Sequence, residues 1–277
     1  MNAGPGFARV DRFLLAGADG LPRYRIQVGV PAEPPPAAGY PVAFLLDGDA
    51  AMQALEAGAQ SVEARAGVAA SPVLAVAIGY DLPADEALAA RAFDYTPPVA
   101  GEPADPRVPA WRNGGADRFL NWIDLALRPE VRRRYAVDAA RHTLCGHSYG
   151  GLCVLHALCS DPGGFERYLA ASPSIWWRDG FLLGSAERLA ASGRKITARV
   201  LLMVGDREAW HARPAGPDGT AASRRGGAPT LPAVRQVATV LERVPGLRVS
   251  FEAVAGGTHA TLPALAARRA LMLGGLD

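Results

Sequence analysis

The chain of 277 residues is long enough for one large α/β domain with a sizeable core, and we expect residues 1–277 to form a single domain. Hydrophobic residues make up 49% of it, and 29 basic against 27 acidic side chains leave a formal net charge of only +2. Because no basic run is interleaved with aromatic residues, this composition excludes a typical nucleic-acid-binding surface.

The amino-terminal part predicts an antiparallel hairpin at one edge of a sheet. Residues 1–10 lack the apolar core of a secretory signal, and no stretch reaches the length of a transmembrane helix, so we expect a cytoplasmic protein without a membrane partner. Residues 24–30 alternate between apolar and polar, as in a half-buried strand. The prolines within residues 31–36 end this strand with a turn that cannot pair in a central sheet. We therefore expect an edge hairpin within residues 1–40.

The pattern then changes to alternating strands and helices. Continuous apolar runs at residues 42–46 and 73–78 are typical of strands covered by helices on both faces, and residues 50–65 predict the crossover helix between them. Residues 81–109 are rich in proline and predict a loop, and residues 117–135 predict an amphipathic helix. This order indicates a mostly parallel sheet whose functional groups gather at the carboxyl ends of the strands.

The motif Gly-His-Ser-Tyr-Gly at residues 146–150 lies between an apolar strand, residues 141–145, and an apolar helical run, residues 152–160. A Gly-X-Ser-X-Gly motif between a strand and a helix is a nucleophile elbow, in which a sharp turn exposes the serine and small flanking residues make room for it. We therefore predict that Ser148 is a catalytic nucleophile. The alternative, an ordinary exposed serine in a glycine-rich turn, is disfavoured by the flanking strand and helix.

A nucleophile elbow predicts an acid after a later strand and a histidine after the last strand. Residues 199–204 predict a buried parallel strand, and Asp206 and Glu208 at its carboxyl end compete for the role of the acid. Residues 247–254 predict the last strand, and His259 follows it in a loop. We therefore expect His259 to be the catalytic base.

One other histidine competes with His259. His211 follows the candidate acids in a polar, arginine-rich segment, residues 211–230, which predicts a loop that is either a surface insertion or a flap over the pocket. The order of elements favours His259 over His211. The three cysteines all lie within residues 145–159 and form neither a disulfide framework nor a zinc-binding spacing, so we expect no metal and no cofactor.

Further segments besides the elbow carry a family resemblance. They are Leu46-Asp47-Gly48-Asp49, Ile78-Gly79-Tyr80, Arg91-Ala92-Phe93-Asp94-Tyr95-Thr96-Pro97, Ala171-Ser172-Pro173-Ser174-Ile175-Trp176-Trp177 and Gly257-Thr258-His259. In this order they resemble the putative esterase family, which includes enterochelin and salmochelin esterases and is related to the mycolyltransferases. The resemblance implies an α/β-hydrolase fold, with a mostly parallel central sheet, helices on both faces and antiparallel amino-terminal edge strands. It also implies ester hydrolysis, and it is closest to members that act on cyclic trilactone siderophores.

The resemblance also implies which groups assist the nucleophile. Two backbone N–H groups would hold the oxyanion, one from Tyr149 and one from Asp49, and Gly48 could share the second role. The acidic pattern of the family matches Glu208 best and leaves Asp206 second, while an effective Ser-His dyad stays open.

Together these features predict a serine esterase that works through an acyl-enzyme on a small-molecule ester. If that ester is a ferric catecholate trilactone, it carries negative charge and aromatic faces, for which Arg91, Trp176, Trp177 and Arg178 offer cations and stacking surfaces. Arg91 could instead bridge to Asp94, and one tryptophan could belong to the core. A general carboxylesterase or thioesterase, or a binding protein without turnover, are the alternatives, and the sequence leaves the oligomeric state open.

Overall fold

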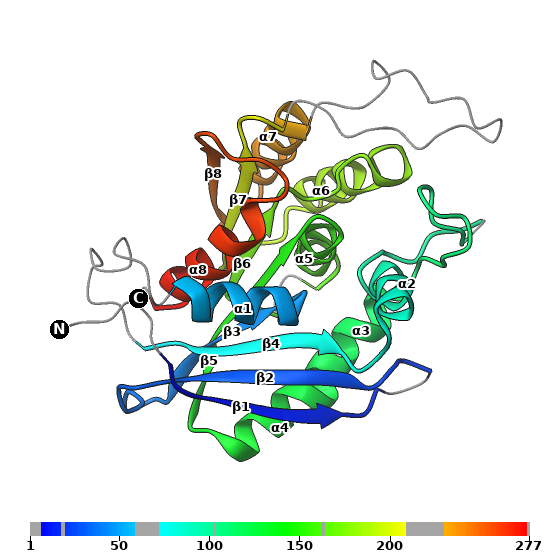
Figure 1. Ribbon diagram of the computed structural model, residues 1–277. Helices are drawn as coiled ribbons and strands as arrows, with labels where there is room; N and C mark the ends of the chain where they lie inside the picture. Colours follow the sequence, from blue (N-terminus) through cyan, green and yellow to red (C-terminus); the bar gives the residue numbers. More distant parts are fainter. Residues whose placement is uncertain are drawn as a thin grey trace.

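The computed structural model describes residues 7–17, 20–58, 72–101, 103–161, 164–208 and 230–275, whose strands form one eight-stranded sheet (Figure 1). The strands are β1 Phe7–Leu15, β2 Tyr24–Pro31, β3 Tyr40–Leu45, β4 Leu74–Tyr80, β5 Val137–His147, β6 Arg167–Ala171, β7 Arg199–Gly205 and β8 Arg248–Val254. The helical elements are α1 Gly48–Gly58, α2 Ala84–Asp94, α3 Ala116–Trp122, η2 Ile123–Leu127, α4 Arg128–Arg134, α5 Tyr149–Ser160, η3 Trp177–Gly180, α6 Phe181–Ala191, α7 Thr230–Leu241 and α8 Leu262–Gly275.

The sheet is antiparallel at its amino-terminal edge and parallel elsewhere. Its strand order is β1-β2-β4-β3-β5-β6-β7-β8. β2 runs antiparallel to both β1 and β4, whereas every other neighbouring pair is parallel. The expected antiparallel edge strands on a mostly parallel sheet are thus confirmed. The parallel order also brings the carboxyl ends of β5, β6, β7 and β8 to the same edge of the sheet.

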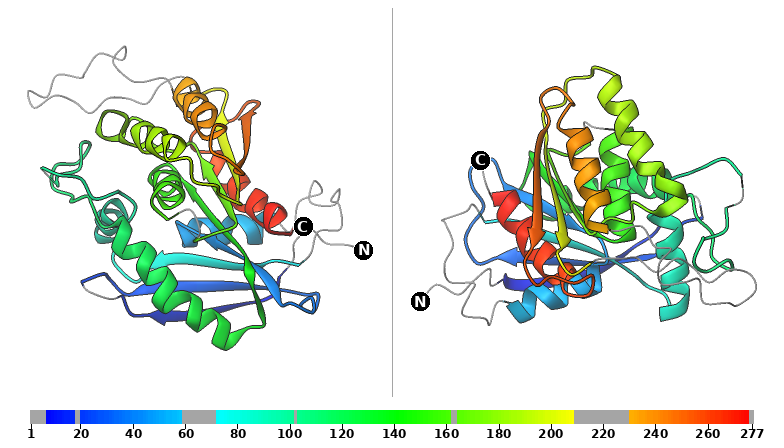
Figure 2. Two further views of the ribbon diagram at one scale, coloured as in Figure 1. Left: turned by 180° about the vertical axis from the view of Figure 1, so that it is seen from behind. Right: turned by 90° about the horizontal axis from the view of Figure 1, so that it is seen from above.

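Helices cover both faces of this sheet (Figure 2). α1 and α8 pack on one face, over a core that includes Leu45, Met52 and Leu271. α3, α5, α6 and α7 pack on the other face, over a larger core that includes Phe44 and Phe119. Because both faces are covered, β3 and β4 are buried along their whole length, as their continuous apolar sequences predicted.

Two local predictions were wrong. Residues 81–109 include the helix α2, in which only Ala92 and Asp94 are buried, so no apolar stripe distinguishes it from a loop in the sequence. β2 is buried at nearly every position and not at alternate ones. The reason is that α1 packs over its polar side as well, where Gln27 donates a 2.8 Å hydrogen bond to Asp49 at the start of α1.

Other predicted segments lie partly outside the described residues. The crossover helix expected over residues 50–65 is present as α1 up to Gly58, and residues 59–71 are not described. Of the loop expected at 211–230, only Thr230 is described, as the first residue of α7, so His211 and the suggested flap are outside the described residues. The helix expected over 117–135 is found as α3, η2 and α4 in succession, with a π-helical turn in its middle.

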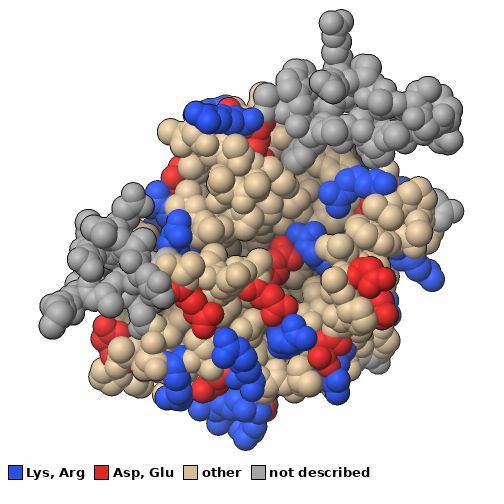
Figure 3. All heavy atoms as spheres, viewed as in Figure 1, with Lys and Arg blue, Asp and Glu red and all other residues tan. Residues whose placement is uncertain are grey.

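The surface matches the low net charge of the chain. On the face shown in Figure 3, acidic and basic side chains are interspersed and do not separate into fields of one sign. Within the described residues, every helix is too short or too polar to cross a lipid bilayer.

Candidate active site

Ser148 lies in a sharp turn between β5 and α5. Its backbone has φ 58° and ψ −115°, a conformation that a non-glycine residue holds only where its surroundings enforce it. A Cβ at Gly146 would lie 2.5 Å from the backbone carbon and oxygen of Gly150, so the turn requires glycine at position 146. A Cβ at Gly150 would make ordinary contacts, the nearest at 3.5 Å from Leu46, so the expected need for a small residue does not hold there.

Ser148, His259 and Glu208 form a hydrogen-bonded row. Ser148 Oγ lies 3.1 Å from His259 Nε2, and His259 Nδ1 lies 3.0 Å from Glu208 Oε2. The three residues follow β5, β8 and β7, whose carboxyl ends share one edge of the sheet. The parallel arrangement of these strands thus brings together three side chains that are far apart in the sequence.

Glu208 is a buried carboxylate with hydrogen-bonding partners on both of its oxygens. Its Oε1 accepts hydrogen bonds from Ser172 Oγ at 2.6 Å and from the backbone N–H of Gly205 at 3.0 Å. Burial raises the pKa of Glu208, but the hydrogen bonds from His259, Ser172 and Gly205 outweigh it, and the pKa lies below its ordinary value. Asp206, the other candidate acid, is exposed, and its side chain makes no hydrogen bond to any described residue.

The ionised state of Glu208 fixes the tautomer of His259. A carboxylate only accepts hydrogen bonds, so the hydrogen of the imidazole lies on Nδ1. The lone pair of Nε2 then faces the hydroxyl of Ser148. In this state the ring can take the proton of the serine, which is the task of a general base.

The backbone groups expected to hold the oxyanion all lie at helix N-termini. Tyr149 is the first residue of α5, and Gly48 and Asp49 are the first two of α1. The first N–H groups of a helix have no acceptor within it and carry the positive end of the helix dipole. The carboxylate of Asp49 is held elsewhere, by Gln27 and by Arg25, so only its backbone is available for this role.

Arg91 joins the two loops that carry these N–H groups. It forms two hydrogen bonds with the carboxylate of Asp47, at 2.5 and 2.8 Å, and one at 3.2 Å with the carbonyl oxygen of His147. Burial lowers the pKa of Arg91, but the charge of Asp47 raises it further and the net pKa is raised. The suggested bridge from Arg91 to Asp94 is absent, because Asp94 accepts its hydrogen bonds from two tyrosines. Arg91 is therefore engaged in the protein itself.

The two tryptophans of the Ser-Pro-Ser-Ile-Trp-Trp segment have different environments. Trp177 is fully buried and donates a 3.0 Å hydrogen bond to Asn113, which makes it the core residue of the pair. Trp176 is partly exposed, and its ring centroid lies 6.0 Å from that of Tyr149. Arg178 donates a 2.9 Å hydrogen bond to the carbonyl oxygen of Ala104. Among these side chains, Trp176 is the one that is partly exposed and lies beside the nucleophile elbow.

The sequence did not identify Arg107 as a candidate site residue. Its guanidinium carbon lies 4.1 Å from the ring centroid of Tyr149 and 5.4 Å from that of Trp176. The hydroxyl of Tyr149 donates a 2.8 Å hydrogen bond to the buried Asp105, which also accepts one from the backbone N–H of Arg107. Because Tyr149 directly follows Ser148, this exposed guanidinium stands close to the elbow. In the sequence, the only sign of this residue's role was a basic side chain in a proline-rich segment, and that pattern is not specific for a functional site.

The other described histidines have structural surroundings. The ring centroid of His147 lies 4.3 Å from that of His259. Burial, together with the nearby His259, lowers the pKa of His147 to about 3, so His147 is neutral and places no second charge beside His259. His156 Nε2 lies 2.6 Å from Asp117 Oδ1, and burial lowers the pKa of His142 to about 4.

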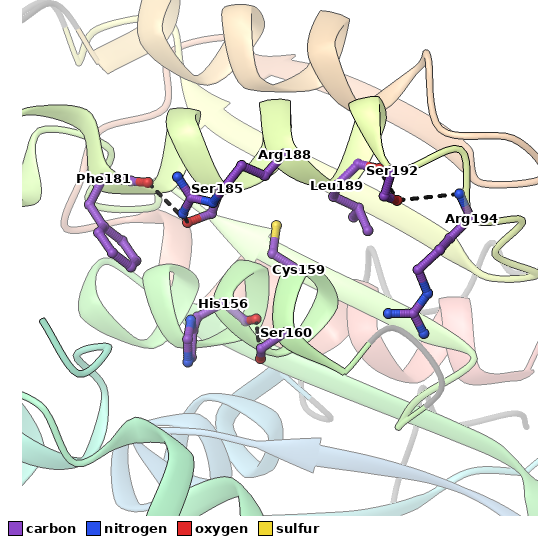
Figure 4. A pocket seen from close by; sticks show the side chains of 9 residues that line it. All are labelled: His156, Cys159, Ser160, Phe181, Ser185, Arg188, Leu189, Ser192 and Arg194. Atoms are coloured by element: carbon purple, nitrogen blue, oxygen red, sulfur yellow. Dashed lines mark hydrogen bonds between the residues drawn. The ribbon is translucent and has the colours of Figure 1, made fainter.

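A cavity of about 300 Å³ lies between α5 and α6, away from Ser148 (Figure 4). Cys159 points into it from α5, and Arg188 donates a 2.8 Å hydrogen bond to Ser185 beside it. Ser160, also in its lining, is a helical rise of about 18 Å from Ser148. His156 also lines this cavity, but its Nε2 lies 2.6 Å from Asp117, and the hydroxyl of Ser160 donates to the carbonyl oxygen of His156. The hydrogen-bonded row of Ser148, His259 and Glu208, and not the cavity, therefore defines the candidate site. The part of the chain that the structure describes contains no cluster of His, Cys, Asp and Glu able to hold a metal ion.

The fold and the site together define a class of protein. A mostly parallel sheet with an elbow serine, followed along the chain by an acid and a histidine at neighbouring strand ends, is the arrangement of an α/β-hydrolase. Residues 22–228 match the model of the family described as Putative esterase, and the chain belongs to this family. The protein is accordingly a hydrolase that acts on ester bonds.

Individual relatives agree with this family. The chain is 36% identical over 196 residues to the ferri-bacillibactin esterase BesA of Bacillus subtilis, an alignment that covers 68% of this chain and 67% of that protein. It is 40% identical over 149 residues to the siderophore triacetylfusarinine C esterase of Aspergillus fumigatus, covering 53% of this chain and 48% of the fungal protein, about half its length. The crystal structure of the BES protein from Bacillus cereus has a TM-score of 0.78 at 26% identity, with 98% of this chain and 97% of that chain covered. The expected α/β-hydrolase fold is confirmed.

Proposed function

We propose that the protein is a siderophore esterase in which Ser148 is the nucleophile, His259 the base and Glu208 the acid. The observation that carries the proposal is the hydrogen-bonded row of these side chains, with distances of 3.1 and 3.0 Å. Two similar proteins that are named as siderophore esterases support the substrate class.

The reaction begins when Ser148 Oγ attacks the carbonyl carbon of the ester and its proton passes to His259 Nε2. Glu208 stabilises the imidazolium that forms. The N–H groups of Tyr149 and Asp49 hold the oxyanion, and the imidazolium then gives its proton to the leaving alcohol. A water molecule, deprotonated by His259, attacks the resulting acyl-enzyme, releases the acid and restores Ser148.

The surface beside the elbow supports a substrate with aromatic and anionic groups. Arg107 lies over the rings of Tyr149 and Trp176 and presents a cation next to a partly exposed indole. A catecholate trilactone carries both negative charge and aromatic faces, which a guanidinium and an indole bind well. We therefore assign substrate contact to Arg107 and Trp176, while contact with Arg178 stays a prediction from the sequence, because its hydrogen bond is to the carbonyl oxygen of Ala104. We no longer assign it to Arg91 or Trp177, because Arg91 is paired with Asp47 and Trp177 is buried.

We keep the cytoplasm as the proposed compartment. All three cysteines are free thiols, and proteins of oxidising compartments more often pair theirs.

The test is hydrolysis of a ferric and a metal-free catecholate trilactone beside p-nitrophenyl acetate, followed by chromatography and absorbance. Ser148→Ala and His259→Ala are compared with the wild type, and Ser160→Ala, at the far end of α5, is the matched control. We expect a higher kcat/KM for a trilactone than for the simple ester, lost in the first two variants and kept in the third. Turnover of p-nitrophenyl acetate alone would retain the serine mechanism and remove the siderophore, and no turnover of any ester would favour a binding protein.

A further inference from the structure

The loop that follows β6 places two buried serines next to Glu208 and Ser148, the two ends of the hydrogen-bonded row. Ser172 and Ser174 are both fully buried. Ser172 Oγ donates a 2.6 Å hydrogen bond to Glu208 Oε1, while Ser174 Oγ lies 3.4 Å from Ser148 Oγ. One short loop thus contacts both the acid and the nucleophile, and the reaction described above does not use either contact.

The backbone of this loop is tied to the same two places. The N–H of Ser172 donates to the carbonyl oxygen of Met203 in β7 at 2.7 Å, and the N–H of Ser174 donates to that of Ser148 at 3.2 Å. Ser172 also has φ 41°, in the left-handed region that side chains other than glycine rarely adopt. Such strain persists only where the surrounding structure enforces it, and it gathers at functional sites.

The direction of the contact between the two serines follows from the tautomer of His259. The single hydrogen of the Ser148 hydroxyl points to His259 Nε2, which carries no hydrogen of its own. Ser174 must therefore be the donor in the contact with Ser148 Oγ. As the proton leaves Ser148, negative charge grows on this oxygen, and a hydrogen bond donated to it becomes stronger.

The hydroxyl of Ser172 orients the acid. With Ser172 and the N–H of Gly205 both on Oε1, the carboxylate of Glu208 has a fixed plane, and Oε2 is left facing His259. We propose that Ser172 is a positioning residue for Glu208 and that Ser174 is a catalytic residue that donates a hydrogen bond to the nucleophilic oxygen. The assignment rests on the proposed function of Ser148, His259 and Glu208, and it deepens that function.

The test compares Ser172→Ala, Ser172→Gly and Ser174→Ala with Ser185→Ala. Ser185 is the matched control, since it is a buried serine that donates to a carbonyl oxygen on α6, away from the row. Glycine at position 172 adopts φ 41° without strain, so this variant lacks the hydroxyl and still folds. Steady-state hydrolysis of p-nitrophenyl acetate across pH gives kcat and KM, and mass spectrometry follows the rate at which a fluorophosphonate labels Ser148.

We expect kcat to fall about tenfold or more in each of the three variants, with little change in KM, because a hydrogen bond to a charged group is lost in each. In both Ser172 variants the acid limb of the kcat/KM profile should also move, since the carboxylate beside His259 has lost a donor. In Ser174→Ala that limb should stay in place. Ser185→Ala should match the wild type in every respect.

Several results would overturn the inference. Hydrolysis and labelling at wild-type rates in Ser172→Ala and Ser174→Ala would remove both roles. Wild-type activity in Ser172→Gly beside a slow Ser172→Ala would show that backbone conformation matters and the hydroxyl does not. If the wild-type protein is labelled but hydrolyses no ester, the proposed function fails on its own, and slower labelling of the variants still supports the two roles.

Discussion

In a Glu208→Gln variant, one carboxylate oxygen is replaced by an NH₂ group, which donates hydrogen bonds and accepts none. The backbone N–H of Gly205 donates to Oε1 and cannot become an acceptor, so the amide oxygen must take that position. The NH₂ group then faces His259 Nδ1, where the carboxylate stood. Two donors would oppose each other there, and the imidazole avoids this by moving its hydrogen to Nε2, the nitrogen that faces Ser148.

An imidazole in that tautomer cannot take the proton of Ser148. We therefore expect kcat to fall by about a thousandfold or more, equivalent to about 4 kcal/mol of transition-state stabilisation. Fluorophosphonate labelling should slow in parallel, while urea denaturation should show a folded protein. Asp206→Asn is the matched control, and because Asp206 is exposed we expect its kcat within about twofold of the wild type.

Two outcomes would refute this reasoning. A Glu208→Gln variant with nearly wild-type kcat would mean that Ser148 and His259 suffice as a dyad. A large loss in Asp206→Asn, with Glu208→Gln active, would mean that Asp206 is the acid in solution and that the hydrogen bond between Glu208 and His259 is not the functional one.

Other predictions concern stability. Burial raises the pKa of Asp94 from its ordinary value of 3.8 to about 7, so between these pH values the native state holds a proton that the unfolded state has lost. The free energy of unfolding should therefore fall by about 4 kcal/mol from about pH 3 to about pH 8. Asp94→Asn should lack this fall in urea denaturation, and an unchanged slope would contradict the reasoning. Gly146→Ala should cost about 3 kcal/mol or prevent folding, whereas Gly150→Ala should change stability by about 1 kcal/mol or less; equal effects would be against it. Arg91→Met leaves the partly buried Asp47 without its cation and should cost about 2 kcal/mol in the same assay, and no loss would mean that the pair is not formed in solution.

The row of the site could be predicted from the sequence, because each member follows a strand whose pattern is clear. The strand pattern by itself left the choice between Asp206 and Glu208 open, and only the resemblance to the family favoured Glu208. The two carboxylates are two positions apart on one turn, and the hydrogen bond from the N–H of Glu208 to the carbonyl oxygen of Gly205 turns Glu208 inward. The direction of the Glu208 side chain depends on how this turn packs against the neighbouring strand ends, and the local sequence pattern does not predict that packing.

The other omissions have a similar cause. α2 has almost no buried face, so it lacks the periodicity that identifies a helix. Arg107 gained its position from Asp105 and Tyr149, the latter more than 40 residues along the chain. Ser172 and Ser174 lay in a segment that resembled the family, but serine is common in loops, and only their neighbours in the fold distinguish these two.

β8 is one of the two outer strands of the sheet, with β7 as its neighbour, and His259 lies in the loop that follows it. The base and the nucleophile are 111 positions apart in the chain, so their hydrogen bond is a contact of high sequence separation. Edge segments open at a lower free-energy cost than the centre of a sheet. Detachment of β8 would therefore take His259 away from Ser148. During refolding, esterase activity should therefore return only when this last strand has docked, later than the helical circular dichroism signal.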